Sequence, residues 1–210
     1  MIIALFTTCI FAQEEQYHAA MKKSLESMDQ ASGPEQYLEC SGSFERIATA
    51  EKSKWLPYYY ASHCLIMFSL NEANGEQKDL VLDRAQEMLN QALELEPEES
   101  ELHVLQAFLY PGRIMIDPVN RGASYMEMTF LALETAKKLN PNNPRIYFLE
   151  GTYKMNIPPS MGGGAEAAKP ILGEAISKFE SFDNPTPFWP TWGKEATQAE
   201  LEKLLYTQIK

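Results

Sequence analysis

The chain has 210 residues, enough for one domain with a substantial core, and its 45% hydrophobic and 22% charged residues are close to globular averages. It carries 18 basic and 29 acidic residues, which gives a formal net charge of −11 at pH 7. This charge argues strongly against a general nucleic-acid-binding surface and disfavours an anionic membrane surface, whereas a basic partner or a cationic ligand stays possible.

The first segment, residues 1–12, is apolar and ends in Phe11-Ala12. It is followed by Gln13 and the acidic Glu14 and Glu15. This pattern is typical of the apolar region and cleavage site of a secretory signal peptide, although the usual basic start is missing. A buried first helix or strand is the alternative. The segment is too short to span a bilayer. We therefore expect a cleaved signal peptide and a soluble mature chain that is periplasmic or secreted.

Apolar residues then recur every three or four positions along stretches free of Gly and Pro, or nearly so. This periodicity predicts amphipathic helices over residues 79–96, 123–140 and 165–182. We also expect an N-terminal helix over residues 16–28 and a capping helix over 197–209, which Thr197 and Glu200 would start as a capping box. Because strand-like alternation never lasts for more than a few residues, the chain is predicted to be all-α.

A small-x-x-x-large-x-x-small pattern occurs four times, with spacings of 42, 44 and 39 residues between copies. The copies are Ser43/Ile47/Ala50, Ala85/Leu89/Ala92, Thr129/Leu133/Ala136 and Ala168/Leu172/Ala175. Small residues at these positions let two helices approach closely, and the large residue fills the gap between them. Pro97 and Pro141 follow two of the helices, and a small residue, Ala107 or Gly151, lies ten positions after each proline.

This arrangement resembles the tetratricopeptide repeat family over roughly residues 34–182. It also resembles a group of exported bacterial members with an extended loop inside each repeat and a GGG loop. The resemblance implies a short right-handed α-solenoid of helix-turn-helix repeats. We expect a single helical domain over residues 13–210, and its parts would be a degenerate unit (14–54), three repeats (55–97, 98–141 and 142–182) and a cap (183–210). The family period is about 34 residues, so the additional residues are expected in loops between paired helices.

The resemblance further implies a concave groove, lined by the first helix of each repeat. At the positions that line this groove in the family, the sequence has Tyr59, His63, Val104, Phe108, Arg145, Phe148, Thr152 and Met155. This surface is aromatic and apolar with a single cation, so it suits a peptide or a small apolar ligand and lacks the basic clamp that grips a C-terminal carboxylate. In the alternative, the protein's own loops or termini partly fill the groove. The aromatic residues Phe188, Trp189 and Trp192 are expected to cover the last repeat, or else to form a peptide platform.

Three expected loops, over residues 71–75, 110–122 and 156–164, would emerge on one edge of a solenoid beside helix N-termini, which favour anions. We expect an anion-binding or acidic-peptide site there. Its residues would be Arg113, Asp117, Arg121, Gly162, Gly163 and Gly164. In the alternative, Asp117 caps a helix that begins at Pro118, the glycines end loops, and one of the arginines pairs with Asp117.

No motif points to an enzyme, a cofactor or a metal. His18, His63 and His103 form no HExxH motif and no Cys/His cluster, and the triple glycine is not followed by the Gly-Lys-Ser/Thr of a phosphate-binding loop. A Gly-x-Ser-x-Gly elbow is also missing from the sequence. We therefore expect no catalytic residues, no cofactor and no metal site.

After cleavage, the remaining cysteines would be Cys40 and Cys64, on two successive helices that reverse near Trp55. Cys40 lies 15 residues before that point and Cys64 lies 9 after it. The mismatch of six residues corresponds to about 9 Å along the helices, beyond the roughly 7 Å that a disulfide spans between Cα atoms. We therefore expect two free thiols.

These observations predict an exported interaction or scaffold module that binds a protein or peptide partner in its concave groove. The alternative is a small-ligand-binding accessory protein of an envelope transport system. An open groove would favour the first function, and an apolar cavity would favour the second.

Overall fold

The computed structural model describes residues 2–72 and 74–207, with side chains from residues 13–72 and 74–204. Within these ranges the regular structure is entirely helical, with nine α-helices and one short 3-10 helix, so the all-α prediction is confirmed. The chain divides into two compact units, Met1–Pro97 and Glu98–Lys210, which we call the N-terminal and C-terminal units. Their boundary coincides with a predicted boundary between repeats; the single domain over residues 13–210 stays a prediction.

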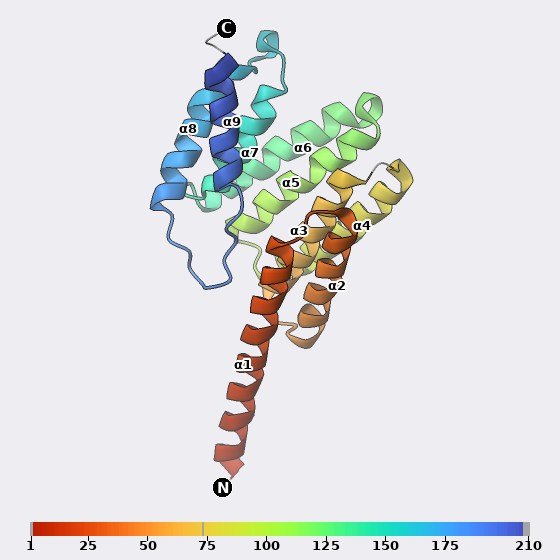
Figure 1. The fold of residues 1–210 in the computed structure, drawn as a ribbon, viewed down its shortest axis with the longest axis vertical. Coiled ribbons are helices and arrows are strands. Elements are labelled where there is room, and N and C mark those ends of the chain that lie inside the picture. The colour runs from red at the N-terminus through yellow and green to blue at the C-terminus, as the bar shows by residue number, and fades with distance from the viewer. Residues whose placement is uncertain (1, 73, 208–210) are drawn as a thin grey trace. The chain divides into compact units, whose positions relative to one another are not determined.

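Each unit consists of consecutive helices that pack side by side as helix-turn-helix pairs (Figure 1). The N-terminal unit contains α1 (Ile2–Asp29), α2 (Pro34–Ala50), α3 (Trp55–Asn71) and α4 (Gly75–Leu95). The C-terminal unit contains α5 (Ser100–Ile116), α6 (Pro118–Leu139), α7 (Pro144–Met155), the 3-10 helix η1 (Pro159–Met161), α8 (Ala165–Ser181) and α9 (Lys194–Thr207). The predicted signal peptide lies outside the residues whose side chains are described, so its cleavage stays a prediction.

The repeated small and large residues form the interior of three of the pairs. In α4, Ala85, Leu89 and Ala92 are fully buried, and the equivalent residues of α6 and α8 are buried as well. The close approach of α7 to α8 depends on Gly151, because a Cβ atom there would lie 2.7 Å from the Leu172 side chain. The copy in α2 differs, since Ile47 is buried whereas Ser43 and Ala50 reach the surface.

The long repeat period comes largely from longer helices, so the expectation of a long loop over residues 110–122 is wrong. α5 runs to Ile116 and α6 begins at Pro118, which makes the expected loop over residues 110–122 helical apart from Asp117. The shorter connection expected over residues 71–75 is present, between the end of α3 at Asn71 and the start of α4 at Gly75. Residues 156–164 do form a loop, around η1. Thr197 lies inside α9 rather than at its cap, and its hydroxyl donates to the Gly193 carbonyl oxygen (2.6 Å).

α5 continues through Pro111 because another side chain replaces the hydrogen bond that proline cannot donate. In a regular helix the N–H of residue 111 would donate to the carbonyl oxygen of Ala107. Here the hydroxyl of Tyr153, on α7, donates to that oxygen over 3.3 Å. Ala107 is fully buried, so without this donor its carbonyl would lose a partner away from water.

We predict that Tyr153→Phe lowers the free energy of unfolding by about 1–3 kcal/mol, because it leaves the Ala107 carbonyl unpaired. The same substitution in a Pro111→Ala background should cost clearly less, since the restored backbone N–H can take over the hydrogen bond. Urea unfolding of the four proteins of this cycle measures the coupling. An equal cost in both backgrounds would contradict the proposed substitution of one donor by the other.

Candidate functional site

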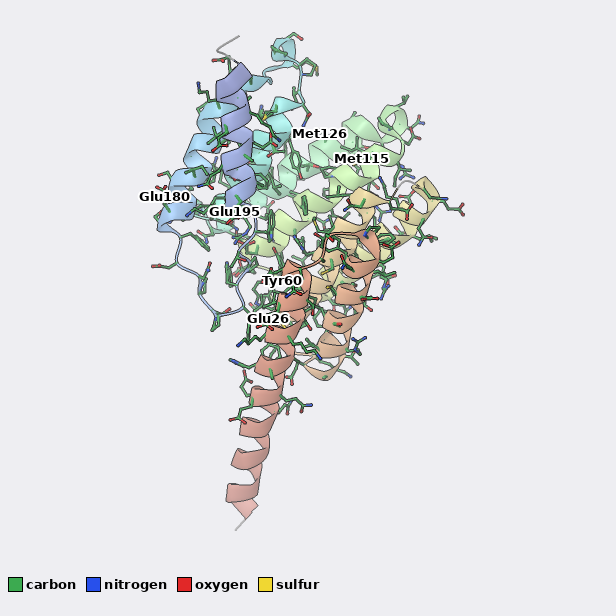
Figure 2. The ribbon with its side chains drawn as sticks, in the orientation of Figure 1. Glu26, Tyr60, Met115, Met126, Glu180 and Glu195 are labelled. Carbon is green, nitrogen blue, oxygen red and sulfur yellow. The ribbon has the colours of Figure 1, made fainter. Side chains whose placement is uncertain are left out.

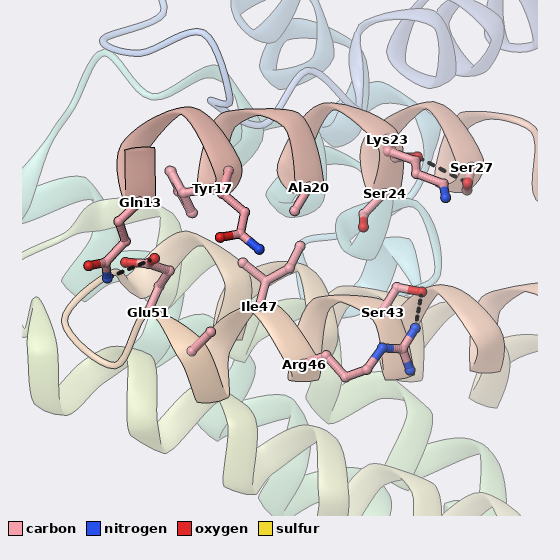
Figure 3. Close-up of a pocket in the computed structure, with 12 residues that line it drawn as sticks. Gln13, Tyr17, Ala20, Lys23, Ser24, Ser27, Ser43, Arg46, Ile47 and Glu51 are labelled. Carbon is pink, nitrogen blue, oxygen red and sulfur yellow. Dashed lines mark hydrogen bonds between the residues drawn. The ribbon is translucent and has the colours of Figure 1, made fainter. Parts of the chain in front are cut away.

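A groove of about 710 Å³ lies between α1 and α2 of the N-terminal unit (Figure 3). This volume is within the range of small-molecule sites, about 300–1,000 Å³. The α1 residues that line it are Gln13, Gln16, Tyr17, Ala20, Lys23, Ser24 and Ser27; the remaining lining residues, in and just after α2, are Ser43, Arg46, Ile47, Ala50 and Glu51.

Short side chains keep this groove open. On α1, Ala20, Ser24 and Ser27 recur at intervals of three or four residues, so they lie along one helical face. On the opposite side of the groove, α2 contributes Ser43 and Ala50, the small residues of the degenerate repeat copy. Because these short side chains do not fill the space between α1 and α2, a groove is left between the two helices.

One end of the groove is aromatic and is fixed by polar contacts. Tyr17 is 6% exposed, and the Lys54 ammonium lies 4.1 Å from its ring centre. Lys54 also donates to both carboxylate oxygens of Glu14, over 2.9 and 2.8 Å. Burial, with the negative charges of Glu14 and Glu51, raises the pKa of Tyr17 to about 12. The Tyr17 side chain is therefore a neutral phenol at physiological pH.

The other end of the groove is cationic. Lys23 and Arg46 line it together with the serines, and the Arg46 guanidinium donates to the Ser43 hydroxyl over 2.9 Å (Figure 3). Among the residues whose side chains are described, no carboxylate forms an ion pair with Lys23 or Arg46. In a chain with a net charge of −11, two uncompensated cations beside hydroxyl groups make this end suited to a ligand's anionic groups.

In the C-terminal unit, the protein's own chain covers the expected concave groove. Trp192, in the segment between α8 and α9, stacks on Phe108 with ring centres 5.4 Å apart and meets Phe148 edge-on at 6.2 Å. This is the alternative in which the protein's own loops fill the groove. Trp192 thus covers part of the last repeat, as expected, and the same role for Phe188 and Trp189 stays a prediction.

Arg145, the single cation of the expected groove, is buried in the interior of this unit, where it pairs with a carboxylate. Its guanidinium lies 2.7 Å from a carboxylate oxygen of Glu101, and the side chains of the two residues are 2% and 0% exposed. It also donates to the carbonyl oxygen of Pro190 and lies 5.5 Å from the Trp192 ring centre. Burial raises the pKa of Glu101 above its ordinary value, although the charge of Arg145 opposes this effect.

The other expected groove positions are also packed inside the protein. Val104 belongs to the core of the C-terminal unit, and Met155 packs against the cluster around Leu172. Thr152 is half-buried. In the N-terminal unit, Tyr59 is fully buried and its ring contacts those of Trp55, Tyr60 and His63 (Tyr60 is labelled in Figure 2). None of the eight expected positions lines the groove between α1 and α2.

The expected loop-edge residues have local structural contacts. Asp117 caps α6: its carboxylate accepts from the backbone N–H (3.1 Å) and the side-chain amide (2.7 Å) of Asn120, and these bonds lower its pKa. Pro118 follows at the first helical position. Arg121 donates its backbone N–H to the Asp117 carbonyl oxygen, and Arg113 lies in the last turn of α5. The cap at Asp117 and the position of Pro118 match the alternative to a binding site, whereas an ion pair of Asp117 with either arginine stays a prediction.

The triple glycine closes its own loop. The N–H of Gly163 donates to the Pro158 carbonyl oxygen, and that of Gly164 donates to the Lys154 carbonyl oxygen. Gly162 and Gly164 have φ angles of 80° and 88°, which glycine adopts without strain. A Cβ atom at Gly163 would collide with Ile157. The glycines therefore shape this loop, and anion binding at the loop edge stays a prediction.

Within the described part of the chain, no group of three or more His, Cys, Asp or Glu side chains gathers as a metal site would require. Across the same residues, every helix is too short or too polar to cross a lipid bilayer.

We predict that Arg145→Met lowers the free energy of unfolding of the C-terminal unit by about 3–5 kcal/mol, because it leaves the buried Glu101 carboxylate unpaired. The double substitution Glu101→Leu/Arg145→Met should recover much of that loss. Lys138→Met, which removes an exposed cation, serves as the matched control and should have little effect. Urea unfolding measures all three; a double variant as unstable as Arg145→Met would contradict the assignment.

The loss caused by Arg145→Met should also depend on pH. The folded-state pKa of Glu101 is already raised, and removing the cation raises it further. Folded Arg145→Met therefore binds a proton at Glu101 more tightly than the unfolded chain does. Its free energy of unfolding keeps this contribution below the ordinary pKa of 4.5 and loses it as the pH rises through the folded-state pKa of Glu101. The difference between wild type and Arg145→Met should therefore grow from pH 4 to pH 7, and a constant difference would be the contrary result.

The chain is similar to known proteins at the level of solved structures. No family model matches the sequence, and no curated protein matches it. Among solved structures, the chain is similar to the HusA haemophore from Porphyromonas gingivalis, with a TM-score of 0.81 and 27% sequence identity. The similarity covers 90% of this chain and 92% of that one. The helical architecture described above is therefore shared with a solved structure over nearly its whole length.

Proposed function

We propose that this protein is a ligand-binding accessory protein that carries haem or a related carboxylated tetrapyrrole in the groove between α1 and α2. The observation that carries this proposal is the groove itself, which combines an apolar wall with two cations that have no carboxylate partner among the described side chains. The similarity to a protein named as a haemophore, over nine-tenths of both chains, supports the same ligand class.

The lining residues fit a flat, largely apolar ring with acidic substituents. Tyr17, Ala20, Ile47 and Ala50 offer an aromatic and aliphatic surface for the ring face. At the cationic end, the ammonium of Lys23 and the guanidinium of Arg46 would bind the ring's carboxylates through charge-assisted hydrogen bonds. Tyr17 and Lys23 are six residues apart on α1, about 9 Å along the helix, so the two ends are spatially separate.

The groove provides little for the iron of haem. Haem iron in proteins is held by His, Cys, Met or Tyr, and Tyr17 is the one residue of these types in the lining. Ligation by Tyr17 would require the phenolate, and burial together with Glu14 and Glu51 opposes its formation. The ring face and the carboxylates are therefore expected to supply most of the affinity, with haem as cargo.

We further propose that the helix pairs are repeats of the tetratricopeptide type, that the protein is exported, and that it binds rather than catalyses. The buried small-large-small residues of α4, α6 and α8 support the first point, and the similarity to a haemophore supports the others. The adaptor function with a peptide in the concave groove has less support, because Trp192 occupies the space beside Phe108 and Phe148.

The test is an absorbance titration of the protein with ferric haem. The wild-type protein should bind haem saturably, and Lys23→Gln/Arg46→Gln should weaken binding about tenfold, equivalent to about 1.4 kcal/mol. Lys22→Gln/Lys52→Gln is the matched control, because it also removes two positive charges from the N-terminal unit, both at exposed positions outside the lining. Haem dimethyl ester, which lacks the free carboxylates, should bind wild type and double variant alike.

Two results would contradict the proposal. Without saturable haem binding by the wild-type protein, the ligand class is wrong. If Lys22→Gln/Lys52→Gln weakens binding as much as Lys23→Gln/Arg46→Gln does, the cations act through general charge and the groove is not the site.

A further inference from the structure

Cys40 on α2 and Cys64 on α3 lie opposite each other, and the aromatic pair beside them fixes this register. The rings of Phe44 and Tyr60 stack with centres 5.1 Å apart. Cys40 lies four residues before Phe44 and Cys64 four residues after Tyr60. Because successive helices run in opposite directions, both steps move one turn the same way along the pair. The two cysteines are therefore neighbours, one turn beyond the two rings.

The two cysteines lie closer together than the sequence predicts, because the chain does not reverse at Trp55. The Phe44–Tyr60 pair centres the reversal on Lys52, and each cysteine is twelve residues from that position. The contact between the Tyr58 hydroxyl and the Ala48 carbonyl oxygen, 3.2 Å, agrees with this register to within one residue. Both cysteines are free thiols in this structure, as expected, yet they are not far apart.

This proximity affects the titration of both thiols. The interaction between them lowers the pKa of Cys40 and raises that of Cys64 well above its ordinary value. Cys64 is 0% exposed, whereas Cys40 is 5% exposed. Cys40 is thus both the more acidic and the more accessible thiol, which makes it the one that reacts first with an external oxidant.

We propose that Cys40 and Cys64 form a redox pair that closes to an intramolecular disulfide and covalently joins α2 to α3. The oxidant is a disulfide, either of a small molecule or of a thiol-disulfide oxidoreductase. The thiolate of Cys40 attacks one sulfur of that disulfide and displaces the other as a thiolate. Cys64, after losing its proton, then attacks the Cys40 sulfur and releases the second thiolate. The pair loses two protons and two electrons, and the oxidant becomes two thiols.

The disulfide would restrain the helix that forms one wall of the ligand groove, because α2 carries Cys40 as well as Arg46 and Ile47. It would close a loop containing the whole turn between α2 and α3. A cross-link of this length restricts the unfolded chain and is expected to raise the thermal midpoint of the N-terminal unit by about 10 °C. The inference stands on the register of α2 and α3 and does not depend on haem binding.

The test uses the full chain with Cys9→Ser, so that Cys40 and Cys64 are its two cysteines. The reduced protein is incubated with oxidised glutathione, both folded and during refolding from urea, so that burial cannot block access. Intact mass should show the loss of two hydrogens, peptide mapping should join the Cys40 and Cys64 peptides, and the oxidised protein should melt at the higher temperature.

Single substitutions provide the controls. Cys64→Ser should stop the reaction at a glutathione adduct on Cys40, and Cys40→Ser should react more slowly in the folded state. The proposal is overturned if both thiols stay free after oxidative refolding, if they cross-link only between molecules, or if the disulfide form melts below the reduced form.

Discussion

The buried ion pair between Arg145 and Glu101 is the contact on which the arrangement of the C-terminal unit depends. It joins α7 to α5, and the same guanidinium donates to the Pro190 carbonyl oxygen and lies near the rings of Phe182 and Trp192, in the segment that follows α8. Two charges away from water are costly unless each finds partners. Three parts of the chain that are distant in sequence must therefore come together around one side chain.

This constraint explains why the face that resembles a peptide-binding groove is closed. The residues expected to face a partner contact the protein's own aromatic segment, with Trp192 against Phe108 and Phe148. A groove that does stay open lies in the N-terminal unit, between α1 and α2. There the repeat pattern is degenerate, and small residues that elsewhere bring helices together border a groove. A departure from the repeat thus coincides with the candidate site.

The two cation environments show how burial determines a side chain's role. Arg145 is enclosed, and its charge is used to hold the unit together. Lys23 and Arg46 lie at an accessible groove end without a carboxylate partner among the described side chains, so they can bind an anionic group from outside. In the same unit, the stacking of Phe44 on Tyr60 aligns α2 with α3 so that the thiols of Cys40 and Cys64 come together. Ligand binding and thiol oxidation would thus both involve α2.

The sequence by itself determined the helices and their pairing, because small and large residues at helical spacing have few other ways to be buried. It also indicated the cap of α6 at Asp117, since capping involves residues only three positions apart. The spacing of Ser43 and Ala50 in α2 and the small residues of α1 were visible signals of the groove, but their significance depends on how closely the two helices approach. Only the tertiary structure decided that Tyr153 replaces the missing donor of Pro111, that Arg145 is buried, and that Cys40 meets Cys64. Each of these contacts joins two different helices. Which residues of two helices face each other depends on the exact residue at which the chain reverses between them, and local sequence patterns do not determine that residue.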